Sequence, residues 1–308
     1  TIFKVNQKMG GGTWVYLGTF DFDKGNSDDN RVVVTNLSEN RGVVTTDAVR
    51  FGGGMGNIER EGNLSELPRC LEGARYYAQW AGAPYKVYSG REGKNDYADD
   101  INTRSLMTNW LGGGSVYMPA LEGKNVPIEL SLALHSDAGF NPDGKSTWGA
   151  LAICTTDFND GMLNSGVSRM ASKDFARALR DNLVTDISAI YGDFGKRYLW
   201  DRNYSETRLP EVPSAILEML SHQSFPDMRI AQDPMGKFAI ARSIYKTILR
   251  YINSNHDKPY VVQPLAPKNF SVELDDNFAN LSWTPQLDSI EPSARPTRYI
   301  VYKAEGKG

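Results

Sequence analysis

Segments with helix-like and strand-like patterns alternate over residues 57–262, and this alternation constrains the fold of the chain more than any other feature. The helix-like segments span residues 65–82, 98–111, 172–191 and 233–253, and the strand-like segments span residues 85–88, 126–135, 148–155 and 214–220. Such alternation is typical of a mainly parallel sheet that is wrapped by helices. The sequence therefore predicts an α/β domain in this region.

Two of the predicted strands carry polar side chains at or near their ends. The second strand ends in His135 and is followed by Asp137, and the fourth carries Glu218 and is followed by His222. Ligands and catalytic groups collect at the carboxyl edge of open α/β sheets. An apolar strand buries an acid only where that acid is paired, bound to a metal or catalytic. These side chains are therefore the first candidates for a functional site.

Each candidate also has a purely structural interpretation. Backbone groups can satisfy a histidine at the end of a strand, which is the alternative for His135. Glu218 could form an ion pair with an arginine such as Arg208, and His222 could be an ordinary loop histidine. Because the chain has only three histidines, one that ends a buried strand carries weight. Both interpretations stay open at this point.

Composition and charge exclude several classes of function. The chain has 308 residues, a formal net charge of -3 and no basic block, which argues against nucleic acid as the main partner. No run approaches the roughly 18 apolar residues of a membrane span, and no signal peptide is visible. The two cysteines, Cys70 and Cys154, do not form a CxxC pair. We expect them to be small buried residues, although spacing alone leaves a disulfide open.

The regions that flank the middle of the chain have strand-like patterns. The alternating segments lie at residues 14–22, 31–36, 42–51, 270–272, 279–283 and 298–303. Each flank has fewer strands than a complete sandwich needs. We therefore predict partial β-sandwich segments over residues 1–56 and 263–308, on either side of the α/β domain at 57–262.

Few chemistries fit the polar residues of the middle region. No Gly-x-Ser-x-Gly is present, which argues against a hydrolase with a serine nucleophile elbow. The glycine clusters at 52–56 and 112–114 are interpreted as a hinge and a helix terminator rather than as phosphate loops. Zinc hydrolases combine about three His, Asp or Glu ligands with a nearby carboxylate base. His135 as a ligand and Glu218 as the base fit that pattern.

Three segments of the middle region, in this order, carry a resemblance to a known family. Arg104 precedes Asn109 by five positions on a predicted helix; Ser131-Leu132-Ala133-Leu134-His135-Ser136-Asp137-Ala138 follows, and then Pro213-Ser214-Ala215-Ile216-Leu217-Glu218. Their order and spacing resemble those of the zinc-dependent N-acetylmuramoyl-L-alanine amidases, which cut the lactyl-peptide amide of peptidoglycan.

The resemblance implies a Zn2+ ion and roles for particular residues. His135 would be a zinc ligand. Glu218 would be the catalytic acid/base, which takes a proton from water and passes it to the leaving amine. The carboxylate ligand of the family lies at the start of its first helix, where Glu66 and Glu72 are alternatives in this chain.

The chain also departs from the family pattern. The family takes its first zinc ligand from a Gly-His-Gly-Gly loop, which these 308 residues do not contain, and we expect that ligand to precede Thr1. Asp137 stands where the family has asparagine, and His222 follows Glu218 by four positions. With Arg104 of the first segment, Asp137 and His222 are the residues that we expect to bind substrate.

The flanks resemble other modules. Residues 1–56, with Gly12-Thr13-Trp14-Val15-Tyr16-Leu17-Gly18-Thr19-Phe20, resemble the second half of a golvesin-like module of the kind found in xanthan lyase-associated proteins. The tail, with Trp283 at the core position, resembles the first strands of a fibronectin type III domain. Both resemblances imply an extracytoplasmic protein that acts on a glycan-rich polymer.

The sequence thus favours an exported, zinc-dependent, amidase-like hydrolase that acts on peptidoglycan or a related glycan-linked amide. A non-catalytic protein that binds cell-surface polysaccharide on a decayed amidase scaffold is the alternative, because the first zinc ligand is missing. A polysaccharide lyase is a more distant third hypothesis, since no tyrosine-and-arginine lyase arrangement is recognisable. The sequence does not fix the oligomeric state.

Overall fold

A computed structural model describes residues 2–5, 7, 17, 20–25, 30–38, 42–49, 51, 59–60, 63–64, 69–92 and 94–304. The chain divides into two compact units, and each unit is described by itself. The first unit comprises Thr1–Ser131, Thr155–Ser172 and Arg202–Ser214. The second unit comprises Leu132–Cys154, Lys173–Asp201 and Ala215–Gly308. The chain passes between the units several times, so neither is one continuous segment.

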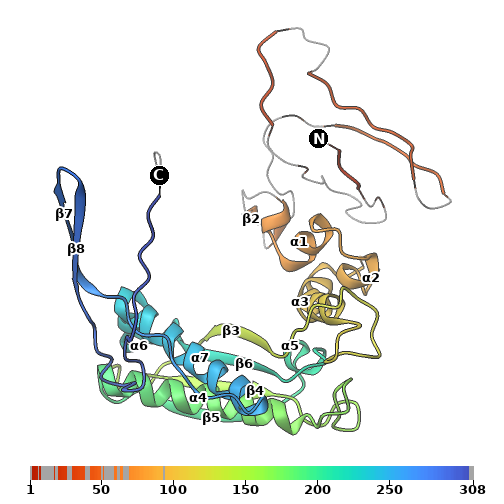
Figure 1. The fold of residues 1–308 in the computed structure, drawn as a ribbon. Coiled ribbons are helices and arrows are strands. Elements are labelled where there is room, and N and C mark those ends of the chain that lie inside the picture. The colour runs from red at the N-terminus through yellow and green to blue at the C-terminus, as the bar shows by residue number, and fades with distance from the viewer. Residues whose placement is uncertain are drawn as a thin grey trace. The chain divides into compact units, whose positions relative to one another are not determined.

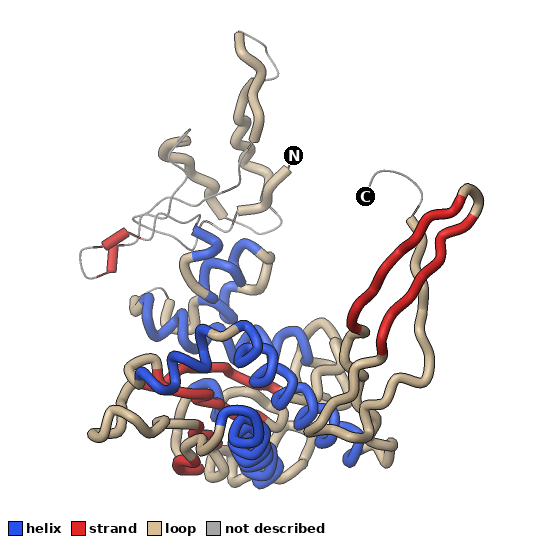
Figure 2. The backbone as a smooth tube through the Cα atoms, turned by 90° about the vertical axis from the view of Figure 1, so that its left-hand side faces the viewer, coloured by secondary structure: helices blue, strands red, loops and turns tan. Residues whose placement is uncertain are grey.

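The second unit contains nearly all of a four-stranded sheet with flanking helices (Figures 1 and 2). Its strands are β3 (Ser131–Asp137), β6 (Ser214–Ser221), β4 (Ala150–Cys154) and β5 (Lys196–Asp201), in that spatial order. Strands β3 and β5 therefore form the two edges. The α/β fold that the alternating pattern predicts is confirmed.

The directions of the strands are mostly parallel. Strands β4 and β5 are parallel. At the start of β3 the Ser131 amide donates to the Pro213 carbonyl, and beyond its end the His222 amide donates to the Asp137 carbonyl. The start of β3 thus lies beside the start of β6, and the end of β3 lies beside the end of β6. These two strands therefore also run in the same direction. Strands β4 and β6 are antiparallel, which the sequence pattern does not predict.

Two long helices pack against each other in the second unit. Helix α4 (Met170–Tyr191) and helix α7 (Pro234–Asn255) meet where the ring centroids of Phe175 and Tyr251 lie 5.1 Å apart. The Lys246 ammonium on α7 lies 3.0 Å from the Asp186 carboxylate on α4. Asp233 caps α7 by accepting a hydrogen bond from the Met235 amide. The helices predicted over residues 172–191 and 233–253 are thereby confirmed.

Strand β4 forms the centre of the core, because all of its residues, Ala150–Cys154, are buried. On one face Leu151 and Ile153 pack with Ile216 of β6, beside Ala133 and Trp200. Both cysteines are free; Cys154 is buried as expected, whereas Cys70 is only partly buried, contrary to the expectation. Burial raises the pKa of the Cys154 thiol to about 12, as expected for a cysteine that serves as a small apolar residue.

The first unit is mainly helical where the structure describes it. It contains 3₁₀ helix η1 (Arg69–Leu71) and helices α1 (Ala74–Trp80), α2 (Tyr85–Tyr88), α3 (Asp96–Gly112) and α5 (Ser205–Arg208), with a short antiparallel pair β1 (Glu59–Arg60) and β2 (Asn63–Leu64). Helix α3 confirms the helix predicted over 98–111.

Helix α1 is shorter than the helix predicted over residues 65–82. The Arg75 amide donates a hydrogen bond to the Asp100 carboxylate of α3, 3.0 Å away. A tertiary contact thus satisfies a backbone N–H group in the first turn of α1, which has no acceptor within the helix. Gly82 follows the helix with φ +79, in agreement with the predicted stop signal. The predicted N-cap, Ser65, lies outside the described residues.

The strand predicted over residues 85–88 is wrong, because this segment forms helix α2. Val87 and Tyr88 turn inward and pack with Ala78 of α1. A segment this short has no reliable periodicity of its own, and tertiary packing decides its conformation. The strand predicted over 126–135 starts later than expected, at Ser131.

The flanking regions are only partly described. In the described parts of residues 31–36 and 42–51 no strand forms, contrary to the prediction, and most of residues 14–22 lies outside the described range. The C-terminal flank contains a hairpin of β7 (Lys268–Asp275) and β8 (Phe278–Thr284), but residues 298–303 are not a strand. A strand needs a paired neighbour, and no such pairing involves these described residues. Among the described helices, none combines the length and apolarity that crossing a membrane requires.

Candidate functional site

His135 and Glu218 lie next to each other in the second unit. Imidazole Nδ1 of His135 is 3.6 Å from carboxylate Oε1 of Glu218. The two side chains come from neighbouring parallel strands, β3 and β6, and are only partly exposed, at 32% and 14%. Glu218 stands opposite Leu151 of β4 in the register, so it belongs to the interior of the sheet. The sheet thus joins two residues that are far apart in sequence.

Arg208, the alternative partner for Glu218, forms other contacts. It belongs to the first unit, where its guanidinium donates to the Asn203 side chain and lies 5.6 Å from the centroid of the Phe158 ring. The partly buried acid of β6 therefore has a histidine for a neighbour.

Asp137, at the end of β3, forms an ion pair with Arg197 of β5. Burial favours the neutral acid, but hydrogen bonds from Arg197 and from the Ala138 amide hold the pKa of Asp137 below its ordinary value. The Arg197 guanidinium also lies 4.5 Å from the centroid of the Trp148 ring. Asp137 is thus a fixed, ionised carboxylate at the same end of β3 as His135.

His222 lies directly beyond the end of β6. Its amide donates to the Asp137 carbonyl, and its Nδ1 lies 3.1 Å from the Ser136 hydroxyl. The ring is exposed, so it can meet a molecule that approaches the strand ends. His135, Glu218, Asp137 and His222 are therefore gathered at one end of β3 and β6, where the sequence predicts a site.

A fully buried carboxylate, Asp227, supports this end of the sheet. It accepts hydrogen bonds from the amides of Trp148 (2.7 Å), Gly149 (3.0 Å) and Ser221 (2.8 Å). These bonds join the start of β4 to the end of β6. Neither Asp227 nor Arg197 is predicted from the sequence. The only signal for Asp227 is the Ser224-Phe225-Pro226-Asp227 pattern, which is typical of a helix start.

Arg104 belongs to the first unit, on helix α3. Its guanidinium lies 3.1 Å from Glu206 and 3.7 Å from Asp100. Asn109, on the same helix, donates to the Leu209 carbonyl and accepts from the Glu211 amide. Asn109 therefore ties α3 to the chain before β6, which is a structural role.

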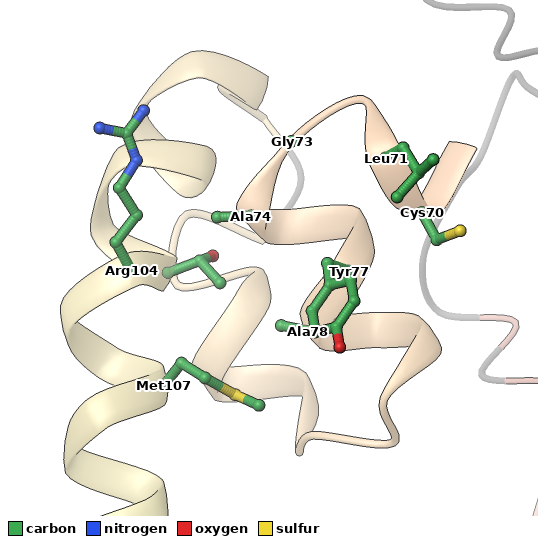
Figure 3. A pocket seen from close by; sticks show the side chains of 9 residues that line it. Cys70, Leu71, Gly73, Ala74, Tyr77, Ala78, Arg104 and Met107 are labelled. Carbon is green, nitrogen blue, oxygen red and sulfur yellow. The ribbon is translucent and has the colours of Figure 1, made fainter. Parts of the chain in front are cut away.

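Arg104 also lines a pocket of about 460 Å³ in the first unit. Figure 3 shows Arg104 and Met107 of α3 across from Tyr77 and Ala78 of α1. Glu72 lies just before α1, half-buried, and is not among the lining residues. Glu66 lies outside the described residues.

The donor atoms in the described residues do not fit a zinc centre. Nowhere in this part of the chain do three or more His, Cys, Asp or Glu side chains gather in a way that could hold a metal ion. A hydrolytic zinc site needs about three protein ligands and a separate base. His135 and Glu218 supply two groups between them.

Residues 1–53 match the family model of the golvesin C-terminal domain. No curated protein sequence matches the chain.

Solved structures of amidases are similar to parts of the chain. The CwlD amidase from Clostridioides difficile, in complex with the GerS lipoprotein, is 14% identical; the match covers 54% of this chain and 66% of that chain, with a TM-score of 0.37. An N-acetylmuramoyl-L-alanine amidase from Clostridium difficile 630 is 14% identical over 66% of this chain and 94% of its own, with a TM-score of 0.36. An N-acetylmuramyl-L-alanine amidase from Mycobacterium smegmatis is 21% identical over 55% and 73%, with a TM-score of 0.36.

Proposed function

We propose that this chain is an amidase-like hydrolase that cleaves a glycan-linked amide, such as the N-acetylmuramoyl-L-alanine bond of peptidoglycan. The observation that carries the proposal is the approach of His135 to Glu218 in the second halves of two neighbouring strands, β3 and β6. The sequence resemblance assigns site roles to these two residues independently of the structure. A histidine and a carboxylate that meet on neighbouring strands are suited to proton transfer.

Glu218 is the acid/base of the proposed reaction. Its carboxylate takes a proton from a water molecule as the water oxygen attacks the amide carbonyl carbon. The carbon–nitrogen bond then breaks, and Glu218 returns the proton to the leaving nitrogen, which yields a carboxylic acid and an amine. His135, 3.6 Å away, orients Glu218. General acid–base catalysis of this kind contributes about 10²- to 10⁴-fold to a rate.

Zn2+ is the cofactor that the resemblance implies, with His135 and either Glu66 or Glu72 as ligands. Because the donors in the described residues do not fit a zinc centre, no step above passes through a metal. The zinc content of the purified protein is therefore a separate measurement. One zinc ion per chain would support the assignment of zinc as the cofactor. An enzyme that is active without bound metal would show that this assignment is wrong.

Three further residues are proposed to bind substrate. Asp137 and His222 stand at the strand ends beside the His135–Glu218 pair, and Arg104 lines the pocket of the first unit. An extracytoplasmic location, with residues 1–56 as a separate golvesin-like domain, belongs to the same proposal. The golvesin match over residues 1–53 supports this domain.

The substitution Glu218→Gln tests the proposed function. It removes the proton acceptor but keeps the size of the side chain, so we expect hydrolysis of purified peptidoglycan to fall at least about 100-fold. The matched control is Glu273→Gln, on an exposed face of β7, which should keep full activity. The appearance of new free amino groups, as peptides are cut from the glycan strands, is the measurement. If the Glu218→Gln protein is correctly folded and as active as the wild type, the assignment is wrong.

A non-catalytic, polysaccharide-binding protein is the second candidate. The observation that favours it is the incomplete set of metal donors in the described residues. A wild-type protein that binds peptidoglycan but releases no product, with or without added zinc, would support this candidate over the hydrolase.

A further inference from the structure

One face of the sheet carries a row of side chains from all four strands. Glu218 stands opposite Leu151, and Ile153 stands opposite both Ile216 and Trp200. Residues two apart on a strand point to the same face, so Tyr198 shares this face with Trp200. The row therefore runs from His135 and Glu218, past Leu151, to Tyr198 on the edge strand β5. Strands are spaced by about 4.8 Å, which places the backbone of Tyr198 about 10 Å from that of Glu218.

An irregularity in β5 determines which side chains reach this end of the row. Ala150 pairs with Lys196 but Ala152 pairs with Leu199, so two residues of β5, Arg197 and Tyr198, stand opposite Leu151 alone. Such bulges bend the strand and change the direction of a side chain, often beside a functional site. Here one of the two residues forms the ion pair with Asp137, and the other presents an aromatic ring to solvent.

The rings of Tyr198 and Trp200 are stacked. Their planes are nearly parallel, at 13°, and their centroids are 6.3 Å apart. Tyr198 is 69% exposed. Trp200, in contrast, packs against the buried cluster of Leu151, Ile153 and Ile216. The core thus holds Trp200 in place, and Trp200 in turn supports the exposed ring of Tyr198.

We propose that Tyr198, supported by Trp200, is a binding platform for a sugar ring of the glycan substrate. A pyranose has an apolar face of C–H groups and a polar rim of hydroxyls, and its C–H face is complementary to the electron-rich face of an aromatic ring. A rigid platform binds without first having to be ordered. The neighbouring Arg197–Asp137 pair offers charged partners for the hydroxyl rim.

The position of the platform fits a substrate in which a sugar is joined to the amide to be cleaved. The proposal rests on the proposed function, because that function supplies the glycan and places the reacting bond at Glu218. The platform adds to that function the part of the substrate that is recognised. This part is the saccharide, which binds on β5, rather than the peptide.

Saccharide binding without a scissile bond tests the platform. The probe is a tetramer of β-1,4-linked N-acetylglucosamine, titrated into the full chain by calorimetry. We expect Tyr198→Ala to weaken binding at least about fivefold, because the ring contact is lost. Tyr198→Phe keeps the ring and should bind as the wild type does. Tyr302→Ala, at a tyrosine that is 87% exposed in the same unit, is the matched control and should change nothing.

The outcomes separate the platform from the proposed function. With peptidoglycan as substrate, Tyr198→Ala should raise KM and leave kcat nearly unchanged, whereas Glu218→Gln should abolish turnover and leave tetramer binding intact. If Glu218→Gln stays active but Tyr198→Ala loses the tetramer, the proposed function fails and the platform remains. No tetramer binding by the wild type, or equal binding by a folded Tyr198→Ala protein, would overturn the platform.

Discussion

At the scale of the residue, Asp227 shows how one buried carboxylate can organise a site that it does not enter. Its two oxygens accept from the amides of Trp148, Gly149 and Ser221 and from the Ser224 hydroxyl. Hydrogen bonds from backbone amides to a carboxylate are stronger than those between neutral groups. Asp227 therefore fixes the loop ends next to His222 and Asp137 without contact to substrate.

We predict that Asp227→Ala destabilises the protein by about 3 kcal/mol or more, because it leaves several buried amides without acceptors. Chemical denaturation of the wild type and the variant measures the difference. Asp143→Ala is the control: its carboxylate is exposed, its contacts are to Ser146 and Lys145, and the variant should stay close to wild-type stability. Equal stabilities of the two variants would contradict the role given to Asp227.

At the scale of the element, two glycines allow β4 and β5 to start side by side. Gly149 has φ +80, and a Cβ atom on it would lie 1.8 Å from the Gly195 carbonyl oxygen. A Cβ atom on Gly195 would lie 2.5 Å from the Trp148 carbonyl oxygen. The Ala150 amide donates to the Gly195 carbonyl at this point. Only glycine permits this backbone approach, which precedes the bulge that presents Tyr198.

Gly149→Ala should therefore destabilise the sheet far more than a glycine-to-alanine substitution at a position where the positive φ is the only source of strain. The matched control is Gly192→Ala, where φ is +84 but no atom lies within 4 Å of the added methyl. We expect the control to lose about 1–2 kcal/mol from its φ alone, and Gly149→Ala to lose more because backbone must also move. Thermal denaturation compares the two, and similar losses would show that the crowding at Gly195 is unimportant.

At the scale of the whole molecule, the chain after α7 is bound to the second unit by charged pairs. Arg242 of α7 lies 2.8 Å from Asp288, and the Tyr260 hydroxyl donates to Glu291. Lys246 lies 3.9 Å from Glu291 and is itself buried. Residues well past the predicted boundary at 262 thus contribute to the unit that contains the sheet.

A chain shortened to end at residue 263 should consequently be less stable than one shortened to end at residue 296. The first truncation removes Asp288 and Glu291 and leaves Arg242 without its carboxylate partner, a loss of about 3–5 kcal/mol for a buried pair. The second truncation keeps these contacts and should unfold near the wild-type temperature. If both shortened chains unfold at the same temperature, the segment after α7 is independent of the second unit.

The long elements and the main site residues can be predicted from sequence because their signals are local. Helices α4 and α7 extend over several turns, so their apolar positions repeat often enough to be recognised. His135 and Glu218 stand out because each interrupts or ends an apolar strand. Helix α2 and the start of α1 could not be predicted, since contacts with other helices decide them.

By itself the sequence determined the α/β class, the long helices, the buried strands and the residues that end them, because periodicity and burial act over neighbouring positions. Only the tertiary structure decided the strand order β3-β6-β4-β5, the antiparallel β6–β4 pair and the partners Arg197, Tyr198 and Asp227. Strand β5, with Lys196, Arg197 and Asp201, gives no apolar signal and becomes a strand by pairing with β4. Pairing joins residues that are distant in sequence, and no local pattern specifies which distant residues will meet.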